Sequence, residues 1–353
     1  MKQMSDKQHP TISTIEDTYA AVQWSQLAQP VHWDTTCQTL TLSYPHTYHH
    51  AALIQQLHQQ VNGSSPTSEI KIRTNIAKHQ PQGLLQPLKK IKNIIAIHAN
   101  KGGVGKSTLA TNIATAIANT GCRVGLLDGD LYGPNQPALI GYHDKTEISE
   151  EQYKPIHRHG IHMMSMGFLI DQTTPLVWRG PMASGYFQQM VFKTDWPELD
   201  YLFIDCPPGT GDILLTMAQK VPVSGVILIT TPQCLSVNDC MKGVAMLNKM
   251  QLPILGFIEN MASYQCQHCH QDNQIFPTGQ AKAQLLRENI NYLGSVPLHQ
   301  NLIKSTENGQ PWLSHHHDDP LSKTIRRIAI RTCSALAQRP LAKPNIYSTA
   351  SKN

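Results

Sequence analysis

The sequence is poor in charge and in aromatic side chains. Charged residues make up 15% of the 353 residues, aromatic residues 6%, and the formal net charge is only +5. No run of Lys or Arg forms a basic arm, so charge does not indicate a nucleic-acid partner. Apolar runs near the ~18 residues that a membrane helix needs are missing, as are a signal-peptide core and an Arg-rich transit pattern. We therefore expect a cytoplasmic protein that binds neither nucleic acid nor membrane.

A disulfide framework is missing as well. The eight cysteines are mostly scattered through segments that have the pattern of a large domain's core, whereas disulfide frameworks belong to small secreted chains. Cys206 stands in such a segment and is expected to be a buried thiol. Cys266 and Cys269 differ, because they form a CxxC pair in a polar stretch. They are the candidate metal ligands.

The pattern of apolar and polar residues divides the chain into two domains. Residues 1–82 predict a small α+β module, with a helix at 13–27, a strand at 39–44, a helix at 49–61 and a strand at 69–76. We expect residues 83–93 to form a linker and residues 94–338 to form the large domain. Residues 339–353 contain two prolines and predict a flexible tail.

The large domain alternates short apolar runs with helical stretches. Strands are expected at 94–99, 124–128, 201–205, 226–230, 254–259 and 292–296. Helices are expected between them, at 107–119, 212–220, 237–250 and 281–289. This alternation is typical of βαβ units and a largely parallel sheet.

A glycine-rich loop follows the first of these strands and precedes the first helix. It reads Asn100, Lys101, Gly102, Gly103, Val104, Gly105, Lys106, Ser107, Thr108. Between a strand and a helix, such a loop lets backbone N–H groups surround phosphates. We therefore expect these nine residues to bind nucleotide, with Lys106 on the β- and γ-phosphates and the Ser107 hydroxyl on Mg²⁺. A glycine-rich turn without ligand is the alternative, but it gives no reason for the Lys-Ser-Thr ending.

Acidic residues stand at the ends of the next two strands. Asp128 and Asp130 follow one apolar run, and Asp205 ends the other. In open α/β sheets ligands bind at the carboxyl ends of the strands. Asp205 is therefore expected to hold Mg²⁺, directly or through water, and Asp130 to orient the attacking water. Helix capping is the alternative role for both carboxylates.

Several segments together carry a resemblance to a known family. The usual glycine of the loop is Asn100 here, and Lys101 is the second lysine of a deviant Walker A motif. The segments are KGGVGKST, LLDGDLYGPNQPALIG, PLVWRGPMASGYFQQ, DCPPGTGDILLT, PILGFIENMASYQCQHC and LGSVPL. They resemble the Mrp/ApbC iron–sulfur cluster carrier ATPases, from about residue 94 to residue 310. The implied fold is an α/β P-loop NTPase with a mostly parallel sheet flanked by helices, preceded by a small α+β domain.

The resemblance also implies a function and partners. It implies a slow ATPase that uses ATP and Mg²⁺, and a homodimer in which Lys101 of each subunit completes the other subunit's active site. It places Asn260 near the adenine base and Pro297 at the turn that closes the pocket. The cargo would be a labile [4Fe–4S] cluster, received from scaffold proteins and delivered to apo iron–sulfur acceptor proteins.

Cys266 and Cys269 supply only half of a closed tetrahedral site, which needs four ligands. Under the resemblance, two subunits each present their pair and share one [4Fe–4S] cluster. A zinc site with His268 or His270, and a redox-active or inert pair, are the alternatives. The histidine run at 315–317 is expected to be a solvated loop.

Two other functions share the deviant loop. A partitioning or spatial-regulator ATPase would need a basic surface or an amphipathic basic C-terminal helix, and the last residues, RPLAKPNIYSTASKN, have no apolar stripe. A nitrogenase-reductase-like electron donor takes its cluster cysteines from two separate segments of each chain. The CxxC pair therefore favours the carrier.

Overall fold

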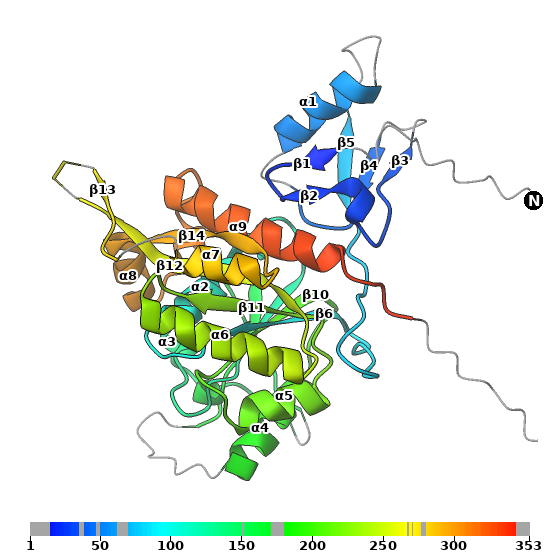
Figure 1. Cartoon of the computed structure of the whole chain (residues 1–353). Helices are drawn as coiled ribbons and strands as arrows, with labels where there is room; N and C mark the ends of the chain where they lie inside the picture. The colour runs from blue at the N-terminus through cyan, green and yellow to red at the C-terminus, as the bar shows by residue number, and fades with distance from the viewer. Residues whose placement is uncertain are drawn as a thin grey trace, which may run out of the picture.

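The computed structural model of the chain shows a small domain joined to a large one (Figure 1). It describes residues 15–34, 39–46, 50–61, 70–149, 152–170, 180–266, 268–269, 271–276 and 280–343. The predicted fold class is confirmed, because a mostly parallel sheet with helices on both faces follows a small α+β domain. Among the described helices, none is long and apolar enough to span a membrane.

The large domain is built on a nine-stranded sheet. Its strands are β6 (Ile91–His98), β7 (Val124–Asp128), β8 (Ile156–Arg158), β9 (Ile161–Met164), β10 (Leu199–Asp205), β11 (Gly225–Thr230), β12 (Ile254–Gln265), β13 (Asp272–Asn273) and β14 (Tyr292–Leu298). Their order is β13-β12-β11-β6-β10-β7-β9-β8, with β14 also paired to β12. All pairings are parallel except β8 with β9 and β12 with β13. Every residue of β10 and β11 is buried, as expected for parallel strands covered on both faces.

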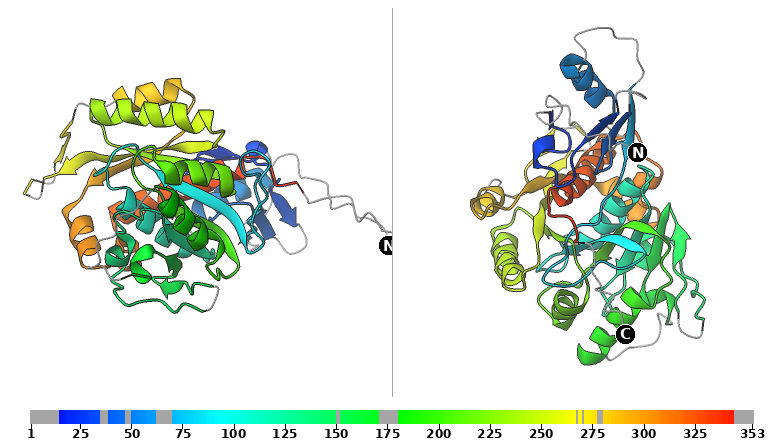
Figure 2. Two further views of the ribbon diagram at one scale, coloured as in Figure 1. Left: turned by 90° about the horizontal axis from the view of Figure 1, so that it is seen from below. Right: turned by 90° about the vertical axis from the view of Figure 1, so that its right-hand side faces the viewer.

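Helices cover both faces of this sheet (Figure 2). They are α2 (Lys106–Ala118), α3 (Gln136–Leu139), α4 (Gly180–Phe192), α5 (Asp212–Lys220), α6 (Cys234–Lys249), α7 (Gln280–Arg287), α8 (Gln300–Glu307) and α9 (Pro320–Ala337). Alternate residues of each central strand point to opposite faces, so they contribute to different cores. Ile95 and Phe203 pack in the core with α2 and α9, whereas Ile94 and Ile204 pack in the core with α4, α5 and α6.

The secondary structure predicted for the large domain is largely confirmed. Apart from the strand expected at 254–259, which continues to Gln265, every predicted strand and helix is present with ends shifted by at most three residues. The prediction missed β8, β9, β13, α3, α4, α8 and α9. Three of these strands and α3 have two to four residues each, too few to show a clear period.

In its described residues, the small domain contains a three-stranded sheet, a short hairpin and one α-helix. Its elements are β1 (Glu16–Asp17), β2 (Val22–Gln23), β3 (His32–Asp34), β4 (Thr39–Leu42), α1 (His50–Val61) and β5 (Lys71–Thr74). The strands expected at 39–44 and 69–76 and the helix expected at 49–61 correspond to β4, β5 and α1. The helix expected at 13–27 is wrong. The Asp17 carboxylate accepts hydrogen bonds from the backbone N–H groups of Tyr19 and Ala20, which favours a turn over a helix.

The C-terminal helix α9 joins the two domains. Ser334 Oγ donates to the carbonyl of Ala20 at 2.6 Å, and Arg331 Nε donates to the carbonyl of Tyr19 at 3.2 Å. Beyond α9, Gln80 N–H donates to the carbonyl of Pro340, and Ala342 N–H donates to the carbonyl of Lys78. The first residues of the segment expected to be a flexible tail are therefore bonded to residues 78–80, just before the expected linker, and residues 344–353 lie outside the described residues.

Candidate functional site

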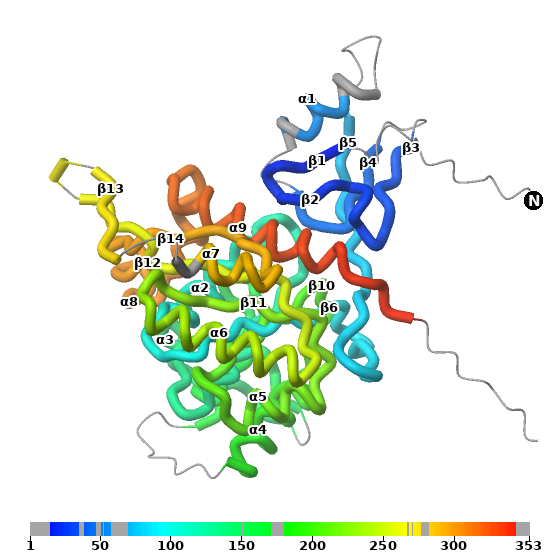
Figure 3. The backbone as a smooth tube through the Cα atoms, viewed as in Figure 1, coloured from blue at the N-terminus to red at the C-terminus, as the bar shows by residue number. Residues whose placement is uncertain are grey.

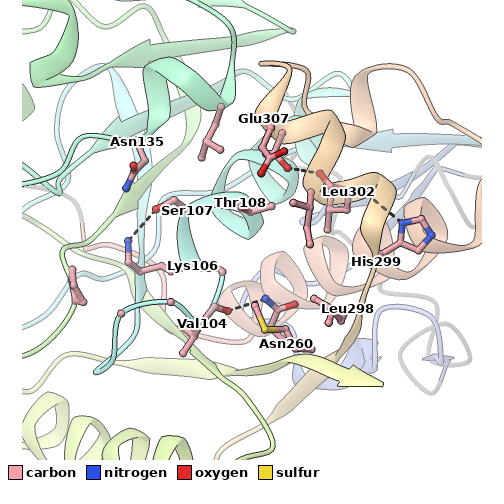
Figure 4. A pocket seen from close by; sticks show the side chains of 18 of the residues that line it. Val104, Lys106, Ser107, Thr108, Asn135, Asn260, Leu298, His299, Leu302 and Glu307 are labelled. Carbon is pink, nitrogen blue, oxygen red and sulfur yellow. Dashed lines mark hydrogen bonds between the residues drawn. The ribbon is translucent and has the colours of Figure 1, made fainter. Parts of the chain in front are cut away.

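The glycine-rich loop lines a cavity of about 710 Å³, into which Lys106, Ser107 and Asn260 extend (Figure 4). The loop leaves the carboxyl end of β6, so the cavity lies at the edge of the sheet where α/β proteins bind ligands. Eleven predicted site residues line it, namely Lys101, Gly102, Gly103, Val104, Gly105, Lys106, Ser107, Thr108, Asp130, Asn260 and Pro297. Asp205 lies behind them and contacts Lys106.

The loop has the backbone conformation of a phosphate cradle. Gly103 and Gly105 have φ values of 78° and 79°, which favour glycine because it has no Cβ. A Cβ on Gly105 would lie 2.3 Å from Asn260 Nδ2, so a side chain at this position would collide. No atom lies within 4 Å of a Cβ position on Gly102 or Gly103. The loop is thus open to a ligand, and α2 begins within it, at Lys106, with its positive dipole end.

Lys106 and Asp205 form a buried ion pair. Lys106 Nζ lies 2.5 Å from Asp205 Oδ1, and the side chains are 7% and 1% exposed. Burial disfavours the charged lysine, but the attraction of Asp205 outweighs it and raises the pKa of Lys106. Lys106 Nζ also lies 3.4 Å from Ser107 Oγ. The ammonium group and the oxygen ligands that suit Mg²⁺ are therefore adjacent.

The two aspartates after β7 have different surroundings. Asp128 is buried and accepts hydrogen bonds from Gln136 N–H and Ser165 Oγ. Burial, together with the nearby charge of Asp205, raises the pKa of Asp128 to about 8. Asp130 lines the cavity, and burial raises its pKa as well. Asp130 is thus the aspartate of this pair that faces the cavity.

Asn100 differs from the other loop residues because its side chain bonds away from the cavity. Its Nδ2 donates to the carbonyl of Asp239 in α6 at 2.7 Å, and its Oδ1 lies 2.9 Å from His98 Nε2. The amide oxygen accepts, so His98 carries its proton on Nε2. Space for this side chain exists because Gly243 has no Cβ; one would lie 2.6 Å from Asn100 Oδ1. Asn100 therefore anchors the start of the loop to α6.

Cys266 and Cys269 lie at the tip of the β12–β13 hairpin, which projects from the large domain (Figure 3). The strand expected to end at residue 259 is longer, because β12 continues past Met261, whose φ is 56°, to Gln265 and pairs with β13. Cys266 is half-buried and Cys269 is exposed. Backbone N–H groups of Cys269 and His268 lower the pKa of the Cys266 thiol. In the described part of the chain no three His, Cys, Asp or Glu residues gather as metal ligands, and His270 lies outside it.

Comparison with known proteins identifies the family of this chain. A family model described as "ParA: NUBPL iron-transfer P-loop NTPase" matches residues 90–333. The chain belongs to this family. Its resemblance to iron–sulfur cluster carrier ATPases is thereby confirmed, because the iron–sulfur cluster carrier protein of Pseudomonas fragi is 42% identical over 281 residues, 79% of this chain and 98% of that protein. The protein of the same name from Escherichia coli K12 is 36% identical over 346 residues, 94% of this chain and 90% of that protein.

Solved structures confirm that the fold of this chain is the P-loop NTPase fold. The nucleotide-binding protein of Archaeoglobus fulgidus in complex with ADP is 33% identical, with a TM-score of 0.57 over 67% of this chain and 92% of that one. The cell division ATPase MinD of Pyrococcus furiosus is 22% identical, with a TM-score of 0.51 over 67% and 96%. At that identity MinD supports the fold alone.

Part of the site of this family member was not predicted from the sequence. One wall of the cavity is formed by the end of β14 and by α8, through Leu298, His299, Leu302, Ile303, Thr306 and Glu307. His299 caps α8 by accepting a hydrogen bond from Leu302 N–H at 3.4 Å. The three- and four-residue spacing of Leu302, Ile303 and Thr306 is a helical signal that could have revealed this wall. Gln136, which contacts Asp205, has no comparable signal.

Proposed function

We propose that this iron-transfer NTPase is a cytoplasmic, ATP-dependent carrier of a labile [4Fe–4S] cluster. The observation that carries the proposal is the path of β12. Asn260 in this strand lines the cavity and donates to the carbonyl of Val104 at 2.8 Å. Six residues later the same strand leads to Cys266 at the hairpin tip. One strand thus connects the nucleotide loop to the thiols, and relatives named as carriers support this combination.

The cavity is proposed to hold ATP with Mg²⁺. Backbone N–H groups of residues 102–108 would surround the phosphates, and Lys106 would exchange Asp205 for the β- and γ-phosphates. Asp205 and the Ser107 hydroxyl would hold Mg²⁺, which neutralises phosphate charge when bound. Asn260 and Pro297 line the part of the cavity proposed for adenine. Asp130 would orient the attacking water in a slow hydrolysis.

Two copies of the chain are proposed to share one cluster. A tetrathiolate site needs four cysteines, and each chain presents Cys266 and Cys269. Lys101 is exposed at the cavity, so it is available to a second subunit's nucleotide, where its charge would act as an arginine finger does. A cluster held at an exposed hairpin tip is accessible to scaffold proteins that load it and to apo acceptors that receive it.

Anaerobic reconstitution with iron and sulfide tests the proposal. We expect about four iron and four sulfide ions per two chains, the absorbance of a [4Fe–4S] cluster, and transfer of that absorbance to an apo acceptor protein. One tightly bound zinc per chain that iron and sulfide do not displace would contradict the carrier and support a zinc site.

A further inference from the structure

A single buried amide contacts both residues that are proposed to hold Mg²⁺. Gln136 is fully buried at the first position of α3. Its Nε2 donates to Asp205 Oδ2 at 2.8 Å and to the carbonyl of Ser107 at 3.2 Å. We propose that Gln136 is a positioning residue that sets the magnesium-binding geometry of Asp205 and Ser107. This inference rests on the proposed nucleotide site.

The orientation of the Gln136 amide is determined by its neighbours. Its Oε1 accepts a hydrogen bond from Thr111 Oγ1 at 2.6 Å, while its Nε2 faces two oxygen acceptors. A flipped amide would place Oε1 against the carboxylate and the carbonyl. The backbone N–H of Gln136 also donates to Asp128 Oδ2 at 3.1 Å. The residue is thus attached to the end of β7 and, through Thr111, to α2.

These contacts give the two oxygens of Asp205 different roles. Oδ1 faces Lys106, and Oδ2 faces Gln136. When Lys106 turns to the phosphates, Oδ1 loses its partner and becomes available to Mg²⁺ or its water. Gln136 keeps its bond to Oδ2, so the carboxylate does not rotate. Among the described residues, this amide is the neutral donor that would still hold the Asp205 carboxylate once Lys106 has moved.

Nucleotide binding measured with and without Mg²⁺ tests this role. The probe is a fluorescent ADP analogue, titrated in excess Mg²⁺ and again in a chelator. In Gln136→Leu and Gln136→Glu we expect affinity in the chelator to stay within about threefold of wild type. The factor by which Mg²⁺ increases nucleotide affinity should fall by roughly tenfold or more, because a hydrogen bond to a charged carboxylate is lost. Thr111→Val, which removes the donor that orients the amide, should show a smaller loss of the same kind.

Gln338→Leu is the matched control, because Gln338 lies at the end of α9, far from the loop in sequence, and its amide donates to the carbonyl of Ser334. This variant should respond to Mg²⁺ as wild type does. Thermal unfolding identifies any variant that does not fold, in which case Thr111→Val decides. Equal loss of affinity with and without Mg²⁺ would show that Gln136 only supports packing and would overturn the inference. Failure of the wild-type protein to bind the nucleotide would instead overturn the proposed function itself.

Discussion

The nucleotide cavity and the cysteine hairpin are built in opposite ways. In the cavity, Lys106 and Asp205 come from distant parts of the sequence and neutralise each other inside one chain. At the hairpin tip, Cys266 and Cys269 are neighbours in sequence, and within the described residues no third metal ligand joins them. The charged groups of the cavity are thus paired by burial inside one chain, whereas under the proposed function the thiols would need ligands from a second chain. A site completed from outside can also be emptied, which suits a carrier.

The largest effect is expected from Lys106, which belongs to the nucleotide cavity and not to the cysteine hairpin. Lys106→Ala should lower ATP hydrolysis by roughly a hundredfold or more, because it removes the charge proposed to stabilise the phosphates. Asp130→Ala should suppress turnover similarly but leave nucleotide binding largely intact, since Asp130 is assigned to water. Phosphate release and binding of a fluorescent nucleotide measure the two effects. Hydrolysis at the wild-type rate in Lys106→Ala would contradict the site assignment.

The reciprocal experiment removes the thiols. Cys266→Ser or Cys269→Ser should lose nearly all reconstituted iron and cluster absorbance together, because each of the two subunits then supplies one thiolate and only two remain at the proposed shared site. Nucleotide binding should remain close to wild type, and transfer to an apo acceptor should fail. Cys234→Ser is the control, as this cysteine is exposed at the start of α6 and is not part of the CxxC pair. Clusters retained at full stoichiometry in both hairpin variants would refute the shared site.

An intermediate effect is expected at Lys101, which belongs to the cavity but is proposed to act in the partner subunit. Lys101→Ala should bind nucleotide and hydrolyse it slowly. Mixing it with Asp130→Ala, whose own Lys101 is intact, should restore part of the activity, because one site of the heterodimer then has both groups. The measurement is ATP turnover against mixing ratio. No recovery in a confirmed heterodimer would argue against action across the interface.

The smallest expected effect is a pH dependence of stability that comes from His98, which contacts Asn100 at the start of the nucleotide loop. Burial lowers the pKa of His98 from 6.5 to about 4, so the unfolded chain takes up a proton in this range and the folded chain does not. The free energy of unfolding should therefore fall by roughly 2 kcal/mol from pH 7 to pH 5 through this residue. His98→Gln, which keeps a donor for Asn100, should show a decrease smaller by that amount in denaturant titrations. Identical decreases would mean that His98 does not resist protonation.

Local patterns in the sequence predicted most of the large domain. The apolar runs of β7 and β11 and the glycine-rich loop at 100–108 are each recognisable from a few consecutive residues. The hairpin of β12 and β13 was missed because its pairing depends on the bend at Met261, which has no side-chain signature. The helix expected at 13–27 is wrong because the Asp17 carboxylate accepts hydrogen bonds from the backbone of its own turn and from the hydroxyl of Tyr44, which follows β4.

The sequence by itself determined the α/β class, the phosphate loop and the family, because glycines, lysines and strand-ending aspartates at short spacing have local causes. Only the tertiary structure decided which groups meet. It turned Asn100 away from the cavity towards α6, brought α8 in as a wall, and placed the Gln136 amide between Ser107 and Asp205. The physical reason is that the polar contacts among these satisfy buried groups from segments up to 139 residues apart in the sequence, and the packing of the sheet and helices determines which segments approach.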